Sequence, residues 1–151
     1  MIQKNKKNLN VLNNLVKSCN IQDKFYFHGK KSVGEELFSM YRQSDIFVSS
    51  STGSEGFPRT IWESMANSCV VIATKAGSVP EILTHKTNAL LVNKNSPEEI
   101  ASSILTLKND IDLSNNLISN ALELAKTNTL ENQSLKMINI LKNQNKRESL
   151  S

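Results

Sequence analysis

The sequence predicts an α/β protein built on a partial parallel sheet of about four strands flanked by helices. Short apolar segments typical of strands alternate with segments whose apolar residues have helical spacing. One of them, Cys69–Thr74, is almost continuously apolar, as expected of a strand covered on both faces. Loops rich in Gly, Ser and Thr follow the expected strands, at the edge where such sheets bind ligands.

Residues 1–23 are expected to form an N-terminal helical segment. Within it, Lys6–Cys19 predicts an amphipathic helix because its apolar residues recur at helical spacing: Leu9, Leu12, Leu15, Val16 and Cys19. The next segment, Lys24–Phe27, is rich in aromatic residues and soon reaches Gly29, which predicts a strand.

A second helix is expected after Ser32. Ser32 and Glu35 have the spacing of a capping box, in which each side chain accepts a hydrogen bond from an amide of the first turn. The helix behind this box is expected to bury Leu37, Phe38 and Tyr41.

The middle of the chain predicts a strand–loop–helix–strand unit. Asp45–Ser49 is a strand rich in β-branched and aromatic residues, and Ser50–Phe57 is a loop of small polar residues. Pro58 suits the first position of a helix that runs to about Asn67. That helix is expected to bury Ile61, Trp62, Met65 and Ala66.

The remaining elements complete the alternation. A turn at Ala76–Pro80 leads to one helical turn at Glu81–Thr84, and Ala89–Val92 is the last expected strand. Ser96 with the following proline and two glutamates is a strong helix start. Residues 24–108 are therefore expected to form the α/β core, and 109–151 to add C-terminal helices, near 112–126 and 129–143, with a tail.

Composition restricts the class of protein. With 151 residues, 38% hydrophobic and 21% charged, the chain suits one soluble globular domain and leaves no room for a second substrate domain. The net charge of +4 comes mostly from Lys4–Lys7 and Lys142–Arg147, which are expected to be solvated tails. Attraction to an anionic membrane surface or a polyanionic substrate is the open alternative.

Further classes are disfavoured by what the sequence lacks. Cys19 and Cys69 form no CxxC motif, which favours inert thiols in a reduced cytosolic compartment. The polar start Met1–Asn10 does not resemble a signal peptide, and no apolar run reaches the length of a membrane span. Basic residues are not interleaved with aromatic ones, so nucleic acid is not an expected partner.

The segment Ser49–Glu63, SSSTGSEGFPRTIWE, is the strongest candidate site. Glu55 lies in the loop after a strand, and Glu63 follows inside the helix with seven residues between them. Free amide groups at the helix start attract anions, and Gly56 lets a ligand approach the backbone. Carboxylates accept hydrogen bonds from vicinal hydroxyls, so the segment suits a nucleotide-sugar. A chance pairing of two glutamates is the alternative interpretation.

Six motifs follow one another from Phe25 to Leu107: FYFHG, YRQSDIFVSSS, EGFPRTIWESMA, VVIAT-x-AGSVPEI, NALLV and SPEEIASSI. In this order and spacing they resemble the C-terminal, donor-binding domain of family 4 glycosyltransferases, also called glycosyltransferase group 1. The resemblance covers over half of the chain. It implies that the parallel sheet is a partial Rossmann-like sheet, the C-terminal half of a GT-B fold.

The resemblance also implies roles for individual residues. Glu55 matches the first glutamate of the E-x7-E motif, which contacts the donor sugar's hydroxyls as nucleophile or charge stabiliser. Glu63 matches the second, which holds the ribose hydroxyls. The other matches are Gly56 and Phe57 at the sugar and phosphate, His28 and Gly29 beside the base, and Gly77, Ser78 and Glu81 in the GG-x-PE turn of the crevice.

The implied reaction moves a sugar, with retention, from a UDP- or GDP-linked donor to an acceptor hydroxyl. Family members of this hexosyltransferase type need no metal or other cofactor, because catalysis consists of positioning and of stabilising the leaving diphosphate. The implied role is polysaccharide biosynthesis in the cytoplasm. Peripheral contact with the inner face of the membrane is left open.

The chain also departs from the family. Pro58, Ser68, Ser78 and Ala89 replace usual glycines, and any that needs a positive φ would cost about 1 kcal/mol. Nothing before Lys24 matches the family's first two strands or their phosphate-binding Arg and Lys, and the acceptor domain is not matched. The isolated chain is therefore expected to expose strand edges and to be marginally stable or completed by a second chain. It is expected to be inactive alone.

Several alternatives remain. A non-catalytic nucleotide-sugar-binding module, a partner subunit or a truncated remnant would fit the same motifs. An epimerase of the same architecture is disfavoured, because the E-x7-E spacing belongs to retaining transferases. Arg59 and Lys75 are weaker candidates for phosphate contacts, and Trp62 is expected to pack in the core rather than stack on a base.

Overall fold

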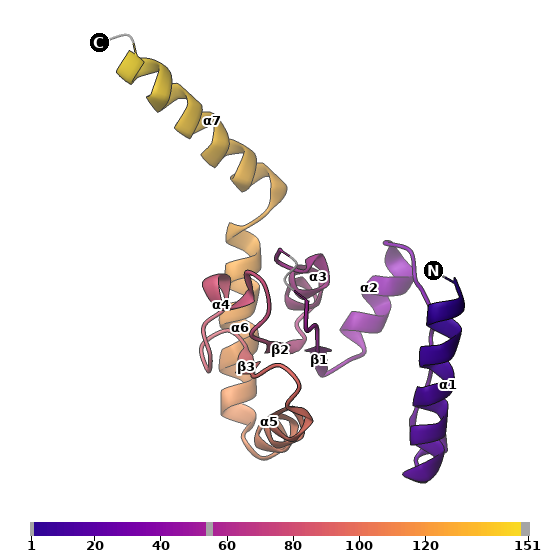
Figure 1. Ribbon diagram of the computed structural model, residues 1–151. Helices are drawn as coiled ribbons and strands as arrows, with labels where there is room; N and C mark the ends of the chain where they lie inside the picture. Colours follow the sequence, from indigo (N-terminus) through magenta and orange to yellow (C-terminus); the bar gives the residue numbers. More distant parts are fainter. Residues whose placement is uncertain (1, 54–55, 149–151) are drawn as a thin grey trace. The chain divides into compact units, whose positions relative to one another are not determined.

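The computed structural model describes residues 2–53 and 56–148. The chain divides between Ser32 and Val33 into two compact units, and each unit is described by itself (Figure 1).

The first unit is helical. Helix α1 spans Ile2–Ser18, which confirms the expected amphipathic helix, and the 3-10 turn η1 spans Gln22–Lys24. The strand predicted at Lys24–Phe27 is wrong, because the described residues there form no strand. An extended segment becomes a strand only beside a hydrogen-bonding neighbour, and the described part of this unit has none. The three aromatic residues are exposed, and the rings of Phe25 and Phe27 lie 5.0 Å apart.

The second unit alternates helices and strands. Its elements are α2 Glu35–Arg42, β1 Ile46–Ser49, α3 Arg59–Ala66, β2 Val70–Thr74, α4 Val79–Ile82, β3 Leu90–Val92, α5 Pro97–Asn109, α6 Ile111–Thr127 and α7 Leu130–Glu148. The described strands form one parallel sheet in the order β1-β2-β3. The predicted α/β fold class is confirmed, and the described residues form three strands in place of about four.

The core lies on both faces of this sheet, because successive side chains of a strand point to opposite faces. On one face, Val71 and Ala73 of β2 pack with Ile61 and Met65 of α3. On the other face, a cluster joins strand residues to helices α5 and α6: Val70, Ile72, Leu90, Val92, Leu107 and Leu117. Strand β2 is buried throughout, as its apolar sequence predicts.

Helix α2 begins later than its sequence predicts. Its N-cap is Gly34, with a φ of 155°, and no side-chain cap bond is present. The capping box predicted from Ser32 and Glu35 is therefore wrong: Glu35 is the first helical residue, so Ser32 is too far upstream to cap. Tyr41 is buried as expected, whereas Leu37 and Phe38 are half-buried.

Helix α3 packs as its spacing predicts except at Trp62, which is half-buried, and at Ala66. Pro58 is the N-cap rather than the first helical residue, a difference of one position. Ile61, Ser64 and Met65 are buried, but Ala66 is exposed, so its predicted burial is wrong. At about 100° per residue, Ala66 turns away from the sheet. Ser64 is tolerated in the core because its hydroxyl donates to the Ile61 carbonyl oxygen at 2.9 Å.

Backbone strain from replaced glycines is confined to Ser68. Its φ is 64°, in the left-handed region, whereas Ser78 has a φ of −82° and Ala89 is not among the residues of positive φ. In the turn after β2, Gly77 takes the positive φ of 52°. This turn leads into α4, which begins at Val79, two residues earlier than predicted.

Candidate functional site

Two loops follow the strand ends that face the same edge of the sheet. Because β1 and β2 are parallel neighbours, the described parts of the loop between β1 and α3, residues 50–53 and 56–58, and residues 75–78 after β2 belong to loops that leave the carboxyl edge. The first loop holds Gly56 and Phe57; the second holds Gly77 and Ser78. The Thr74 hydroxyl donates to the carbonyl oxygens of Ser49 and Ser51, which ties β2 to the first loop.

The other predicted residues have different settings. Glu81 lies on α4 and is exposed. Glu55 lies outside the described residues. His28 and Gly29 belong to the first unit, where Gly29 has a φ of 68°. A Cβ added at Gly56 would meet no atom within 4 Å, so open space adjoins the backbone at that position.

Glu63 is the best-defined polar group of the candidate site. Its side chain is only 11% exposed and lies on α3, just beyond the loop that leaves β1. Each carboxylate oxygen has one partner: Oε1 forms an ion pair with Nε of Arg59 at 2.9 Å, and Oε2 accepts a hydrogen bond from the Tyr41 hydroxyl at 3.2 Å. A carboxylate this buried needs such partners, because burial removes its hydration.

Tyr41 reaches Glu63 from α2 and is itself buried. Its ring packs edge-on against Phe47 of β1, with centroids 5.7 Å apart. Burial first, and then the negative charge of Glu63 and the hydrogen bond to it, raise the pKa of Tyr41 to about 12. The hydroxyl is therefore protonated at neutral pH and can donate to the carboxylate.

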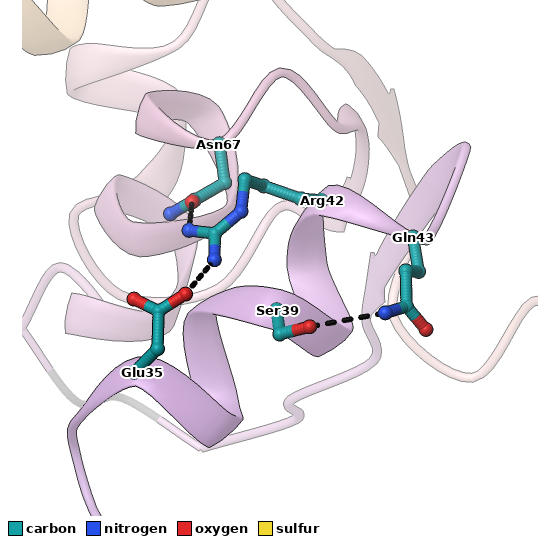
Figure 2. A network of polar contacts seen from close by, with 5 residues as sticks. All are labelled: Glu35, Ser39, Arg42, Gln43 and Asn67. Atoms are coloured by element: carbon teal, nitrogen blue, oxygen red, sulfur yellow. Dashed lines mark hydrogen bonds and ion pairs between the residues drawn. The ribbon is translucent and has the colours of Figure 1, made fainter.

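A polar network joins α2 to the end of α3 (Figure 2). Nη1 of Arg42 donates to the side-chain oxygen of Asn67 at 3.3 Å, and Nη2 pairs with Glu35. The Asn67 side-chain nitrogen in turn donates to the carbonyl oxygen of Glu63 at 2.8 Å. The Gln43–Ser39 bond, 3.0 Å long, lies within the α2 segment. These contacts hold α2, and with it Tyr41, against α3.

A cavity of about 410 Å³ adjoins this carboxylate. It is lined by Phe38, Trp62, Glu63, Ala66, Asn67, Ala125, Asn128 and Thr129. The indole of Trp62 is half-buried against the core and lies 4.6 Å from the ring of Phe57, measured between centroids. The contact with Phe57 ties α3 to the loop that precedes it.

Two residues that contact Glu63 carry little or no signal of that contact in the sequence. Tyr41 was expected only as a core residue, because its helical spacing does not reveal that its hydroxyl reaches Glu63, 22 residues away. Arg59 does carry a sequence signal: it precedes Glu63 by four positions, which places the two side chains on one helix face.

Lys75, a weaker candidate for a phosphate contact, follows β2 at the carboxyl edge of the sheet. Its Nζ donates to the side-chain oxygen of Asn93 at 3.4 Å.

The described residues contain neither a metal-binding cluster nor a membrane-spanning helix. No group of three His, Cys, Asp or Glu side chains there is placed to hold a metal ion. Within the same described part, no helix combines the length and apolarity needed to cross a membrane.

Comparison with known proteins decides the family. The model of the family "Glycosyl transferases group 1" matches residues 5–124. This chain belongs to that family. An uncharacterized glycosyltransferase of Methanocaldococcus jannaschii, MJ1178, is 39% identical over 98 residues, which are 65% of this chain and 27% of that protein.

Solved structures agree. The C-terminal domain of the group 1 glycosyl transferase LpcC from Francisella tularensis has a TM-score of 0.73 and 34% identity, and the match covers 81% of this chain and 62% of that domain. Anabaena HepE in complex with UDP-glucose has a TM-score of 0.79 at 24% identity, over 88% of this chain and 36% of that one, and shows the fold alone. The resemblance to the C-terminal part of a GT-B glycosyltransferase is confirmed, and the chain spans about a quarter of MJ1178.

Proposed function

We propose that this chain is the nucleotide-sugar-binding portion of a retaining glycosyltransferase that transfers a sugar from a UDP- or GDP-linked donor to an acceptor hydroxyl. The observation that carries the proposal is Glu63, an almost buried carboxylate at the position of the second glutamate of E-x7-E. It lies on the helix that follows the carboxyl-edge loop of β1, where such sheets bind nucleotides. The complex of HepE with UDP-glucose supports this class of ligand.

In this proposal each residue contacts one part of the donor. Glu63 accepts hydrogen bonds from the ribose hydroxyls, and Glu55 contacts the sugar. Amides at Gly56 and Phe57 meet the sugar and phosphate, and Gly77, Ser78 and Glu81 line the crevice. His28 and Gly29 contact the base. Residues 24–108 form this binding core, between the helical segment 1–23 and the C-terminal part 109–151.

Calorimetric titration with UDP, GDP and UDP-glucose tests the proposal. We expect Glu63→Ala to weaken binding of both UDP and UDP-glucose about tenfold, because both ligands lose the ribose contact. Glu55→Ala should weaken binding of UDP-glucose only, because UDP has no sugar for it to hold.

The matched control is Glu123→Ala, which removes an exposed carboxylate on α6. Its affinities should equal those of the wild type. Equal loss in the Glu63 and Glu123 variants, or the absence of binding by every nucleotide tried, would contradict the proposed function.

A non-catalytic binding module or partner subunit is the second candidate. The outer side of β1 supports completion by a second polypeptide: β1 pairs only with β2 among the described strands, and Val48 is 38% exposed. The β3 edge differs, since His85 accepts a hydrogen bond there from the Leu91 amide at 3.0 Å. An unprotected edge is a template for another strand.

Turnover of UDP-glucose separates the two candidates. The isolated chain should bind nucleotide without consuming the donor, and transfer should appear when the polypeptide carrying the acceptor domain is added. In that mixture Val48→Lys should abolish transfer by charging the β1 edge, whereas Leu105→Lys at an exposed position of α5 should not. Turnover by the isolated chain would contradict completion by a second polypeptide.

We further propose a cytoplasmic location with peripheral contact at the inner face of the membrane. Helix α7 supports this, since exposed Leu135, Ile138 and Leu141 lie on the same helix as Lys136 and Lys142. Sedimentation with vesicles that contain phosphatidylserine should retain the chain at low salt and release it at high salt. Equal retention by neutral vesicles would contradict an electrostatic contact.

A further inference from the structure

We infer that Tyr41 and Arg59 are positioning residues that orient the Glu63 carboxylate so that one acceptor site on each of its oxygens faces a pair of vicinal hydroxyls. The inference rests on the proposed function, whose ribose contact it explains. Neither residue is proposed to touch the ligand through this role.

The hydrogen-bonding capacity of a carboxylate supports the inference. Two carboxylate oxygens offer about four lone-pair sites. Among the described residues, the partner of Oε1 is the Arg59 ion pair and the partner of Oε2 is the Tyr41 hydroxyl, so each oxygen keeps an acceptor site for a further donor. Two adjacent acceptors match the two adjacent donors of a cis-diol, the arrangement of the ribose 2′ and 3′ hydroxyls.

The two partners fix the carboxylate from different elements. Arg59 precedes Glu63 by four residues on α3, so this pair sets the rotamer along the helix. Tyr41 comes from α2, where burial and the edge-on contact with Phe47 restrict its ring. A carboxylate held at both oxygens loses little further freedom when a ligand binds, which favours affinity.

The preference for UDP over 2′-deoxy-UDP, measured as the ratio of their affinities, tests the inference. A purely structural role of Tyr41 would not change this ratio. The wild-type chain should bind UDP more tightly than the deoxy ligand, because one carboxylate oxygen loses its donor. Tyr41→Phe keeps the ring and its packing but removes the hydroxyl. We expect it to weaken UDP binding about fivefold and to reduce the preference over 2′-deoxy-UDP by a similar factor.

The control is Tyr26→Phe, which removes an exposed hydroxyl that donates to the Asp23 carbonyl oxygen in the first unit. It should keep the wild-type preference. A wild type without preference for UDP contradicts the ribose contact of the proposed function. A wild type with that preference and a Tyr41→Phe variant that retains it would overturn the positioning role alone. Arg59→Gln should also weaken UDP binding, as Tyr41→Phe does.

Absorbance titration tests the Tyr41–Glu63 contact without any ligand. In a Tyr26→Phe background Tyr41 is the single tyrosine, since the chain has two. Burial is the largest cause of its raised pKa; Glu63 and Cys69 raise the pKa further, and Arg59 lowers it. Adding Glu63→Gln should therefore lower the pKa of Tyr41 from about 12 toward its ordinary value of 10.0. An unchanged titration would overturn the contact on which the inference depends.

The raised pKa of Tyr41 also determines how its contribution to stability changes with pH. The contribution of Tyr41 is fully present below its unfolded pKa of 10.0 and is lost as pH rises toward about 12, because the unfolded chain then releases the proton more readily. The alkaline limb of the unfolding curve should become shallower in Tyr41→Phe.

Discussion

Ser68 holds a backbone conformation that L-residues rarely adopt, with a φ of 64° between α3 and β2. Its amide donates to the carbonyl oxygen of Met65, and the next amide, of Cys69, donates to Ser64 at 3.0 Å. These bonds close the helix and start the strand, so the turn keeps its shape although the residue is not glycine. The cost is local strain of about 1 kcal/mol.

Replacing this residue by glycine should relieve the strain. Ser68→Gly is expected to raise the free energy of unfolding by about 0.5 kcal/mol, because the relief exceeds the extra backbone entropy of glycine. Urea denaturation measures the change. Ser78→Gly is the control: at a φ of −82° there is no strain to relieve, so this change should lower the free energy of unfolding. Equal effects at both positions would contradict the explanation by strain.

The two cysteines, Cys19 and Cys69, should differ in reactivity because one is exposed and the other is buried. Cys69 is buried, its thiol donates to the Tyr41 carbonyl oxygen at 3.1 Å, and burial together with the nearby Asp45 charge raises its pKa to about 11. Cys19 is exposed. Since the thiolate is the reactive form, an aromatic disulfide reagent at pH 8 should label Cys19 rapidly and Cys69 only upon unfolding. Rapid labelling of Cys69 in the folded Cys19→Ser variant would contradict its burial.

At the scale of the element, helix starts in this chain differ in how they are capped. Asp110 caps α6, since its carboxylate accepts a hydrogen bond from the Leu113 amide at 2.9 Å. Ser96 occupies the same position before α5 without a side-chain cap bond, and Pro97 follows it. A residue type suited to capping therefore marks where a helix begins, but its rotamer decides whether the bond forms.

This difference predicts unequal effects of the same substitution. Asp110→Ala should lower the free energy of unfolding by about 1 kcal/mol, because an amide at the start of α6 loses its acceptor. Ser96→Ala should change it by less than about 0.3 kcal/mol, because no cap bond is lost. Thermal unfolding of both variants checks the prediction, and an equal loss in the two would refute it.

At the scale of the molecule, α6 links the two clusters that cover the sheet. Leu117 belongs to the cluster with Ile72 and Leu90, and Ala121, one turn later, to the cluster with Val71 and Ala73. A helix that contributes to both cores makes their stabilities interdependent. The second unit should therefore unfold in one cooperative transition.

A core truncation tests this interdependence. Leu117 is 0% exposed, and Leu117→Ala should lower the free energy of unfolding by about 3 kcal/mol, a large part of a typical 5–15 kcal/mol. The matched control is Leu105→Ala on α5, where the side chain is 58% exposed and the loss should stay below about 0.5 kcal/mol. Two separate transitions in the Leu117 variant would argue against coupled cores.

The amino-acid sequence by itself determined the alternation of elements and the position of the candidate site. Continuous apolar runs such as Cys69–Thr74 identify buried strands, and the motifs from Asp45 to Ile82 place the loops that follow them. These features are local, because propensity and periodicity act over a few neighbouring residues. The same locality explains why Ser32 and Ala66 were misassigned, since each depended on where a helix begins or faces.

Only the tertiary structure decided which long-range partners exist. Lys24–Phe27 has the composition of a strand, but a strand forms only where another strand pairs with it, and the described unit supplies none. The contact of Tyr41 with Glu63 likewise spans 22 residues and leaves no periodic trace. Pairing and side-chain reach depend on how elements meet in space, which is why the sequence located Glu63 but could not show what orients it.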